Sequence, residues 1–165
     1  MPSTMATKSK SAKRTTTKAK RPARKPAAKA ARPKRKQPET LRFRTATPSF
    51  TVNDYPRSVA WYRDVFGCHL EEEWKRDGKV VGGQLRAGSV VFMIGQDDFA
   101  KGRDRKKGEG FRIYCTTRQK IDQLASEIKA RGGVLASEPA DTPWGTREFS
   151  VVDPDGFKIT VTRDQ

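Results

Sequence analysis

Histidine is almost absent from this 165-residue chain, which contains His69 alone, and cysteine occurs only as Cys68 and Cys115. Proteins hold zinc and most transition metals with clusters of His and Cys at short spacings, and no such cluster occurs here. Two cysteines this far apart form no disulfide framework, so we expect two reduced thiols in a cytoplasmic protein. A Cys–His catalytic pair is also disfavoured, because Cys115 is far from His69 in the sequence.

Long apolar runs are missing as well. No stretch approaches the roughly 18 consecutive apolar residues that a membrane-spanning helix needs. The basic N-terminal residues are not followed by the apolar core of a signal peptide. We therefore expect no membrane partner.

Acidic residues are nearly missing from the first forty positions, where Glu39 stands against 14 Lys and Arg. Between Met5 and Leu41 there is also no Leu, Ile, Val or aromatic residue, so this segment cannot bury enough apolar surface to fold. The composition predicts a disordered basic tail, rich in Lys, Ala and Pro, over residues 1–42. Dense cations bind nucleic acid without sequence preference by releasing counterions. The cations that we assign to polyanion binding are Lys18, Lys20, Arg21, Arg24, Lys25, Arg32, Lys34, Arg35 and Lys36.

Two other interpretations of the tail stay open. It could be a solvated segment without a dedicated partner, or an organellar transit peptide, although it has no apolar face of the kind that transit peptides carry. No aromatic residue lies between the cations to stack on a base. Binding to nucleic acid would make the protein nucleoid-associated within the cytoplasm.

The remaining chain is nearly balanced in charge, because residues 41–165 carry 21 Lys and Arg against 18 Asp and Glu. Its hydrophobic periodicity changes several times between strand and helix patterns. The predicted strands cover residues 45–52, 68–75, 79–88, 89–96, 111–117, 134–140, 146–153 and 156–163, and the predicted helices cover 53–67 and 118–133. The order is βαβββ twice, which predicts an α+β domain over 43–165 with module one at 45–96, a connector at 97–110 and module two at 111–165.

Three stretches carry a family resemblance: VNDYPRSVAWYRDVFG at 52–67, EIKARGG at 127–133 and PWGTREFSVVDPDGFKI at 143–159. With them, residues 45–165 resemble the vicinal-oxygen-chelate superfamily, which includes glyoxalase I, the bleomycin-resistance proteins and the extradiol dioxygenases. The resemblance implies two modules whose curled mixed sheets enclose a cavity. It also implies a homodimer, because many short members pair their modules across two chains.

Metal-dependent members of that superfamily take ligands from four strand positions. Carried over to this sequence, those positions are Thr47, Met93, Phe111 and Thr160. None of the four suits a divalent metal, so the resemblance implies the fold without its best-known metal chemistry. The run Glu71–Glu73 does not replace them, because consecutive residues of a strand point to opposite faces.

The same positions would instead line a moderately apolar cavity for a small organic ligand. The cavity residues that we predict are Thr47, Ser49, Met93, Phe111, Ile113, Trp144 and Thr160. We therefore expect a small-molecule-binding protein that uses no metal or other cofactor, and the residues favour binding over catalysis without settling whether it is an enzyme. Two alternatives stay open: a metal-dependent lyase or dioxygenase of the glyoxalase class, and a nucleic-acid-associated protein that uses the domain as a dimerising scaffold.

Overall fold

The computed structural model describes residues 43–163, which form two four-stranded sheets. The basic tail predicted over residues 1–42, with its nine assigned cations, lies outside the described residues. None of the described helices is long and apolar enough to span a membrane.

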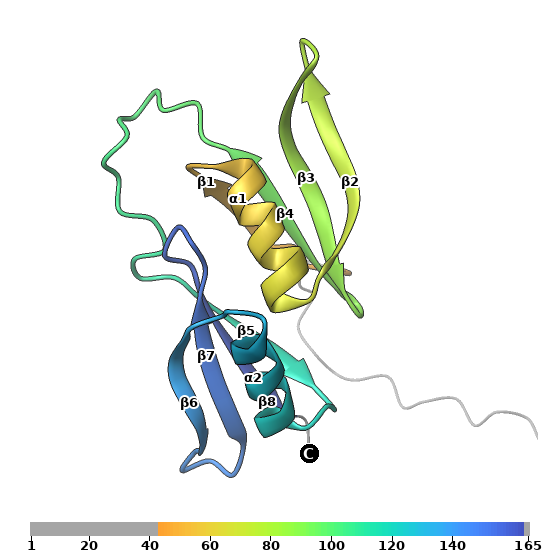
Figure 1. Cartoon of the computed structure of the whole chain (residues 1–165), viewed down its shortest axis with the longest axis vertical. Coiled ribbons are helices and arrows are strands. Elements are labelled where there is room, and N and C mark those ends of the chain that lie inside the picture. The colour runs from red at the N-terminus through yellow and green to blue at the C-terminus, as the bar shows by residue number, and fades with distance from the viewer. Residues whose placement is uncertain (1–42, 164–165) are drawn as a thin grey trace, which may run out of the picture. The chain divides into compact units, whose positions relative to one another are not determined.

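Module one follows the βαβββ order that the sequence predicts. Its elements are β1 (Ser49–Val52), α1 (Tyr55–Ala60), η1 (Trp61–Phe66), β2 (His69–Arg76), β3 (Lys79–Ala87) and β4 (Val90–Gln96). The strand order is β1-β4-β3-β2, with β1 parallel to β4 and the other neighbours antiparallel (Figure 1). This mixed sheet brings Ser49 of β1 opposite Met93 of β4.

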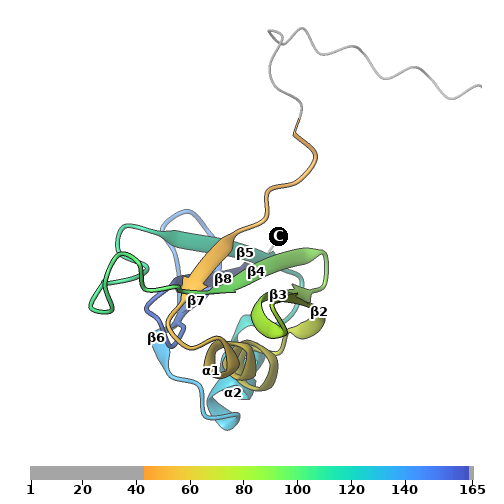
Figure 2. The ribbon, with the colours of Figure 1, turned by 90° about the horizontal axis from the view of Figure 1, so that it is seen from above.

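Module two repeats the arrangement, which confirms the predicted internal repeat. Its elements are β5 (Arg112–Thr117), α2 (Ile121–Ala130), β6 (Leu135–Asp141), β7 (Arg147–Val152) and β8 (Lys158–Arg163). The strand order is β5-β8-β7-β6, and β5 is parallel to β8, with Tyr114 opposite Thr160. Both helices lie on the same side of strands β4, β5 and β8 (Figure 2).

The first helix begins and ends where its sequence predicts. The Asp54 carboxylate accepts the backbone N–H of Arg57 and caps the helix, and Pro56 fits the first turn. The second half, η1, is wound as a π-helix, and its Tyr62 carbonyl accepts the N–H of both Gly67 and Cys68. Gly67 ends it at a φ of 94°, a left-handed conformation that glycine adopts without steric cost.

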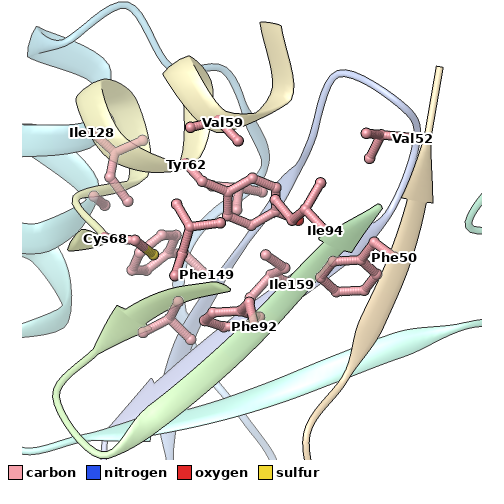
Figure 3. Close-up of a cluster of buried hydrophobic side chains, with 14 of the residues drawn as sticks. Phe50, Val52, Val59, Tyr62, Cys68, Phe92, Ile94, Ile128, Phe149 and Ile159 are labelled. Carbon is pink, nitrogen blue, oxygen red and sulfur yellow. The ribbon is translucent and has the colours of Figure 1, made fainter. Parts of the chain in front are cut away.

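One hydrophobic core is shared by the two modules. Phe50 and Phe92 of module one and Phe149 and Ile159 of module two are at most 1% exposed, and they surround the buried Tyr62 ring (Figure 3). Burying aromatic side chains of this size is the main favourable contribution to folding. The core therefore joins the sheets through the faces that the helices cover.

The turn between β7 and β8, Asp153-Pro154-Asp155-Gly156, connects module two to module one. We call it the DPDG turn. The Asp155 carboxylate accepts the N–H of Asn53 at 2.7 Å and the hydroxyl of Ser58 at 2.9 Å. Asp153 accepts the buried Tyr62 hydroxyl at 3.0 Å, and burial raises the pKa of that carboxyl. The stretch that carries the family resemblance thus binds the first helix of the other module.

Candidate functional site

The sheet of module two has one face over which the described chain puts no helix, and we call it the module-two open face. Thr160 of β8 is paired with Tyr114 of β5 and with Ser150 of β7, and Thr162 is paired with Glu148. Cross-strand partners point to the same side of a sheet. These five side chains therefore share the open face, while Ile159 and Val161 point into the core.

Thr160 lies at the centre of this face with no exposed surface. Its hydroxyl is 2.9 Å from the Ser150 hydroxyl, and the two form a buried hydrogen bond. The Thr162 hydroxyl is also buried but has no hydrogen-bond partner within the described residues. An unpaired buried hydroxyl costs free energy, so a ligand or water that reached it would gain a hydrogen bond.

Tyr114 provides the aromatic surface of the module-two open face, with 54% of its area exposed. The Arg112 guanidinium lies 5.8 Å from the centre of the Tyr114 ring and donates a hydrogen bond to its hydroxyl at 3.1 Å. This pair presents a ring face and positive charge to anything that binds over β5.

The faces predicted for Phe111 and Ile113 are wrong. Phe111 precedes β5, and its ring packs edge-on against buried Phe50 with centroids 6.2 Å apart. Ile113 is paired with Ile159 and packs against the core. Both therefore lie opposite the Thr160 side, which holds Arg112 and Tyr114 instead. The prediction extended the strand to Phe111 and thereby inverted the alternation of faces.

The sheet of module one has a corresponding module-one open face. Met93 is paired with Ser49 and with Gln84, and Trp74 covers the neighbouring Gly82. Ser49 is exposed and Met93 is half-buried, so both are accessible. Thr47 is exposed and lies before β1, two residues ahead of Ser49.

A polar network crosses the module-one open face. Glu71 accepts hydrogen bonds from Arg86 and from Gln84, and these bonds hold the pKa of the Glu71 carboxyl below its usual range. Glu73 is bound elsewhere, where it accepts the Tyr55 hydroxyl at 3.2 Å. Burial, reinforced by the charge of Glu73, raises the pKa of Tyr55. The three consecutive glutamates thus do not converge on one point.

The side chains at the four paired positions of the open faces do not fit a divalent metal. With the corrected register, the paired positions next to Met93 and Thr160 are Ser49 and Tyr114. Together these four side chains supply one thioether and three hydroxyl groups, whereas divalent metals prefer carboxylate, imidazole or thiolate ligands. Among residues 43–163, no three His, Cys, Asp or Glu side chains lie close enough together to hold a metal ion.

Trp144 and the two cysteines were also singled out from the sequence. Trp144 is 67% exposed in the β6–β7 turn, which hydrogen bonds between Thr142 and Thr146 close. Both cysteines are free, and burial raises the pKa of the Cys68 thiol to about 12 and that of Cys115 to about 11. Both are therefore protonated at neutral pH and weak nucleophiles.

Sequence reasoning missed Tyr114, Arg112 and Ser150. The signal was present for Tyr114, because it alternates along β5 with Ile113 and Cys115 and therefore points to the same side as Arg112 and Thr116. Which of the two alternating sets faces Thr160 depends on the β5–β8 register, which the sequence does not specify.

Comparison with known proteins gives a consistent picture. Residues 44–161 match the model of the Glyoxalase/Bleomycin resistance protein/Dioxygenase superfamily. A probable lactoylglutathione lyase of Vibrio cholerae is 27% identical over 121 residues, which are 69% of this chain and 86% of that protein.

Solved structures share the fold at lower identity. TioX from Micromonospora sp. ML1 aligns with a TM-score of 0.60 and 22% identity over 72% of this chain and 97% of its own. A member of the glyoxalase/bleomycin resistance protein/dioxygenase superfamily from Sphaerobacter thermophilus aligns with a TM-score of 0.59 and 20% identity, covering 74% of this chain and 98% of that one.

Proposed function

This chain belongs to the glyoxalase/bleomycin resistance protein/dioxygenase superfamily, and from that membership we propose that its folded domain binds a small organic molecule without a catalytic metal. The observation that carries the proposal is the chemistry at the paired positions of the two open faces. Ser49, Met93, Tyr114 and Thr160 offer apolar contact and hydroxyl groups but no carboxylate or imidazole.

The ligand that suits these faces has an aromatic or other flat apolar part and a few hydrogen-bonding groups. The exposed ring of Tyr114 and the half-buried Trp74 offer stacking surfaces, and Met93 adapts to irregular shapes. The Thr162 hydroxyl and the Glu71 network offer polar partners. Sites for small molecules commonly combine apolar walls with a few such groups.

A second copy of the chain would close the site. Each open face alone is a sheet surface, and a ligand on it would remain largely exposed to water. Facing sheets from two copies would enclose it, so we propose a homodimer as the binding unit.

A metal-dependent lyase of the glyoxalase class is the alternative, and the match to the Vibrio cholerae protein favours it. Such a reaction needs a Lewis acid held by the protein. Pairing modules from two chains does not supply the missing metal ligands, because both chains contribute the same four side chains.

The test is a ligand-observed NMR screen of the full-length protein against aromatic fragments, with EDTA present. We expect fragments that bind without metal and that lose at least about tenfold in affinity in Tyr114→Ala, because the main stacking surface is removed. Val134→Ala, which removes an exposed apolar side chain just before edge strand β6, separated from β8 by β7, is the matched control. Metal-dependent turnover of the hemithioacetal of methylglyoxal and glutathione would overturn the proposal in favour of the lyase.

We further propose that residues 1–40 bind nucleic acid without sequence preference. Their 14 Lys and Arg are opposed by one Glu. The connector of the folded domain offers little competition, because four of its five cations already have partners. Arg105 and Lys107 bind Asp97 at 2.6 and 2.7 Å, Lys106 is 3.5 Å from Glu109, and Arg103 lies over the Phe99 ring.

Fluorescence anisotropy with duplex DNA at several salt concentrations tests the tail. If half of the tail cations engage phosphates, the slope of log affinity against log salt should be roughly −6. A chain without residues 1–40 should bind weakly or not at all. Equal affinity of the two chains would assign DNA binding to the folded domain and contradict the proposal.

A further inference from the structure

A cavity of about 480 Å³ lies between the two modules, away from both open faces. Its walls come from the end of η1, the β3–β4 hairpin, the loop from β5 to α2 and one side of α2. It is reached from the core side of the sheets, because Phe92 and Phe149 line it while Met93 and Thr160 do not. It is therefore a site separate from the one proposed above.

Much of the lining of this inter-module cavity is apolar, and Ser89, Thr116, Thr117 and Gln119 add uncharged polar groups. Phe66 and Val90 of module one face Leu124 and Val161 of module two across it. Cys115 adds a sulfur, and because burial raises the pKa of its thiol to about 11, that sulfur carries no charge at neutral pH. The volume is within the range of small-molecule sites, and these walls favour a hydrocarbon or aromatic group.

The rim of the cavity is cationic. Arg131 and Arg118 both line it, and Glu127 is the only acidic residue that does. Arg131 is already bound, because its Nε donates to the Val65 carbonyl at 2.8 Å and its Nη1 lies 3.9 Å from Glu127.

Arg118, in contrast, is exposed and makes no hydrogen bond or ion pair within the described residues. A guanidinium with all its donors available is suited to bind an anionic group such as a carboxylate or sulfonate in a two-pronged contact.

We propose that the inter-module cavity binds a small amphipathic organic anion. Its apolar part lies among Phe66, Leu124 and Cys115, and its anionic group is bound by Arg118 at the rim. Because the walls come from both modules, a bound anion stabilises their mutual arrangement.

The test uses the aromatic sulfonate 1-anilinonaphthalene-8-sulfonate as the probe and the full-length protein at fixed salt. Cys115 reports on the cavity directly. At pH 9, alkylation by iodoacetamide is followed at Cys115 and Cys68 by peptide mass spectrometry, with and without saturating probe. We expect the probe to slow alkylation of Cys115 several-fold and to raise its own fluorescence on binding.

In the variant Arg118→Gln, about tenfold more probe should be needed to protect Cys115 from alkylation, because the substitution removes a charge-assisted contact. Arg103→Gln is the matched control, since it removes an exposed arginine from the connector that does not line the cavity, and it should leave the protection unchanged. Alkylation of Cys115 that is insensitive to the probe, or equal effects of the two variants, would overturn the proposal. Neither result depends on whether the open faces bind a ligand.

Discussion

Thr160 has its hydroxyl bound to Ser150 and no exposed surface, although it lies on the side of the sheet where the proposed ligand binds. It completes a buried hydroxyl pair on the strand next to Tyr114. A ligand would instead contact neighbouring side chains that reach the surface, such as Tyr114. At the scale of single residues, the site therefore combines buried hydroxyl groups with an exposed aromatic side chain on the neighbouring strand.

The first prediction concerns metal content. Protein purified without a His tag should contain no stoichiometric zinc, nickel, iron or manganese, because Ser49, Met93, Tyr114 and Thr160 are poor ligands for these ions. EDTA should leave the melting temperature unchanged. Elemental analysis by mass spectrometry is the measurement, and one metal ion per chain would contradict the assignment of these positions.

Residue positions were predictable from the sequence only where a motif anchored them. Thr160 follows the DPDG turn at a fixed distance, and it does lie on the open face. Phe111 had no such anchor. It follows a Gly-rich connector, its backbone N–H bonds to Gly108 in a turn, and β5 begins only at Arg112. A one-residue error in a strand inverts every face, which is why the partner of Thr160 was missed.

At the scale of elements, the helix and strand order was predictable because Gly67 and the Gly132-Gly133 pair end amphipathic segments. The π-helical winding of η1 was not predictable, and neither was the hydrogen bond from its Tyr62 to the buried Asp153, 91 residues later. Such a long-range hydrogen bond leaves no trace in local periodicity.

The second prediction concerns the DPDG turn. Asp155→Ala removes the acceptor of the Asn53 N–H and of the buried Ser58 hydroxyl, so it should lower the free energy of unfolding by roughly 1.5–3 kcal/mol. Urea unfolding at pH 7 measures this. Asp104→Ala, which removes the same charge from the exposed connector, should change stability by less than about 0.5 kcal/mol. Equal effects of the two variants would show that the turn does not hold the modules together.

The third prediction concerns the connector and pH. Hydrogen bonds from Lys107 and then Arg105 hold the pKa of the Asp97 carboxyl well below its usual range. The stabilisation from this depressed pKa is therefore fully present above the unfolded value of about 4 and is lost as pH falls toward the folded value. Wild type should exceed Asp97→Asn in stability at pH 7, and this advantage should shrink below pH 4.

Denaturant unfolding at several pH values between 3 and 7 measures this difference. Asp104→Asn is the control within the same connector. An advantage of wild type that stays constant down to pH 3 would show that the ion pair with Lys107 does not set the stability of the connector.

At the scale of the whole molecule, the two open faces lead to the fourth prediction, a homodimer formed by the folded domain. A chain that begins at Thr40 should sediment at twice the monomer mass, because pairing open faces covers the exposed Tyr114 ring and Val152. Tyr114→Arg should weaken the dimer through repulsion with Arg112 of the same face, whereas Val134→Arg should not. A monomer at micromolar concentration would contradict a shared site.

The DPDG turn also has a consequence for how the protein is made. Asp155 is synthesised 102 residues after Asn53, the residue whose backbone it binds. At 5–20 residues per second, about 5–20 s therefore pass between the synthesis of Asn53 and that of the carboxylate that binds it. During this interval the Ser58 and Tyr62 hydroxyls can bond only to water. A premature stop before the DPDG turn would thus release a first module that had never completed its own packing, in a form suited to chaperone capture or proteolysis.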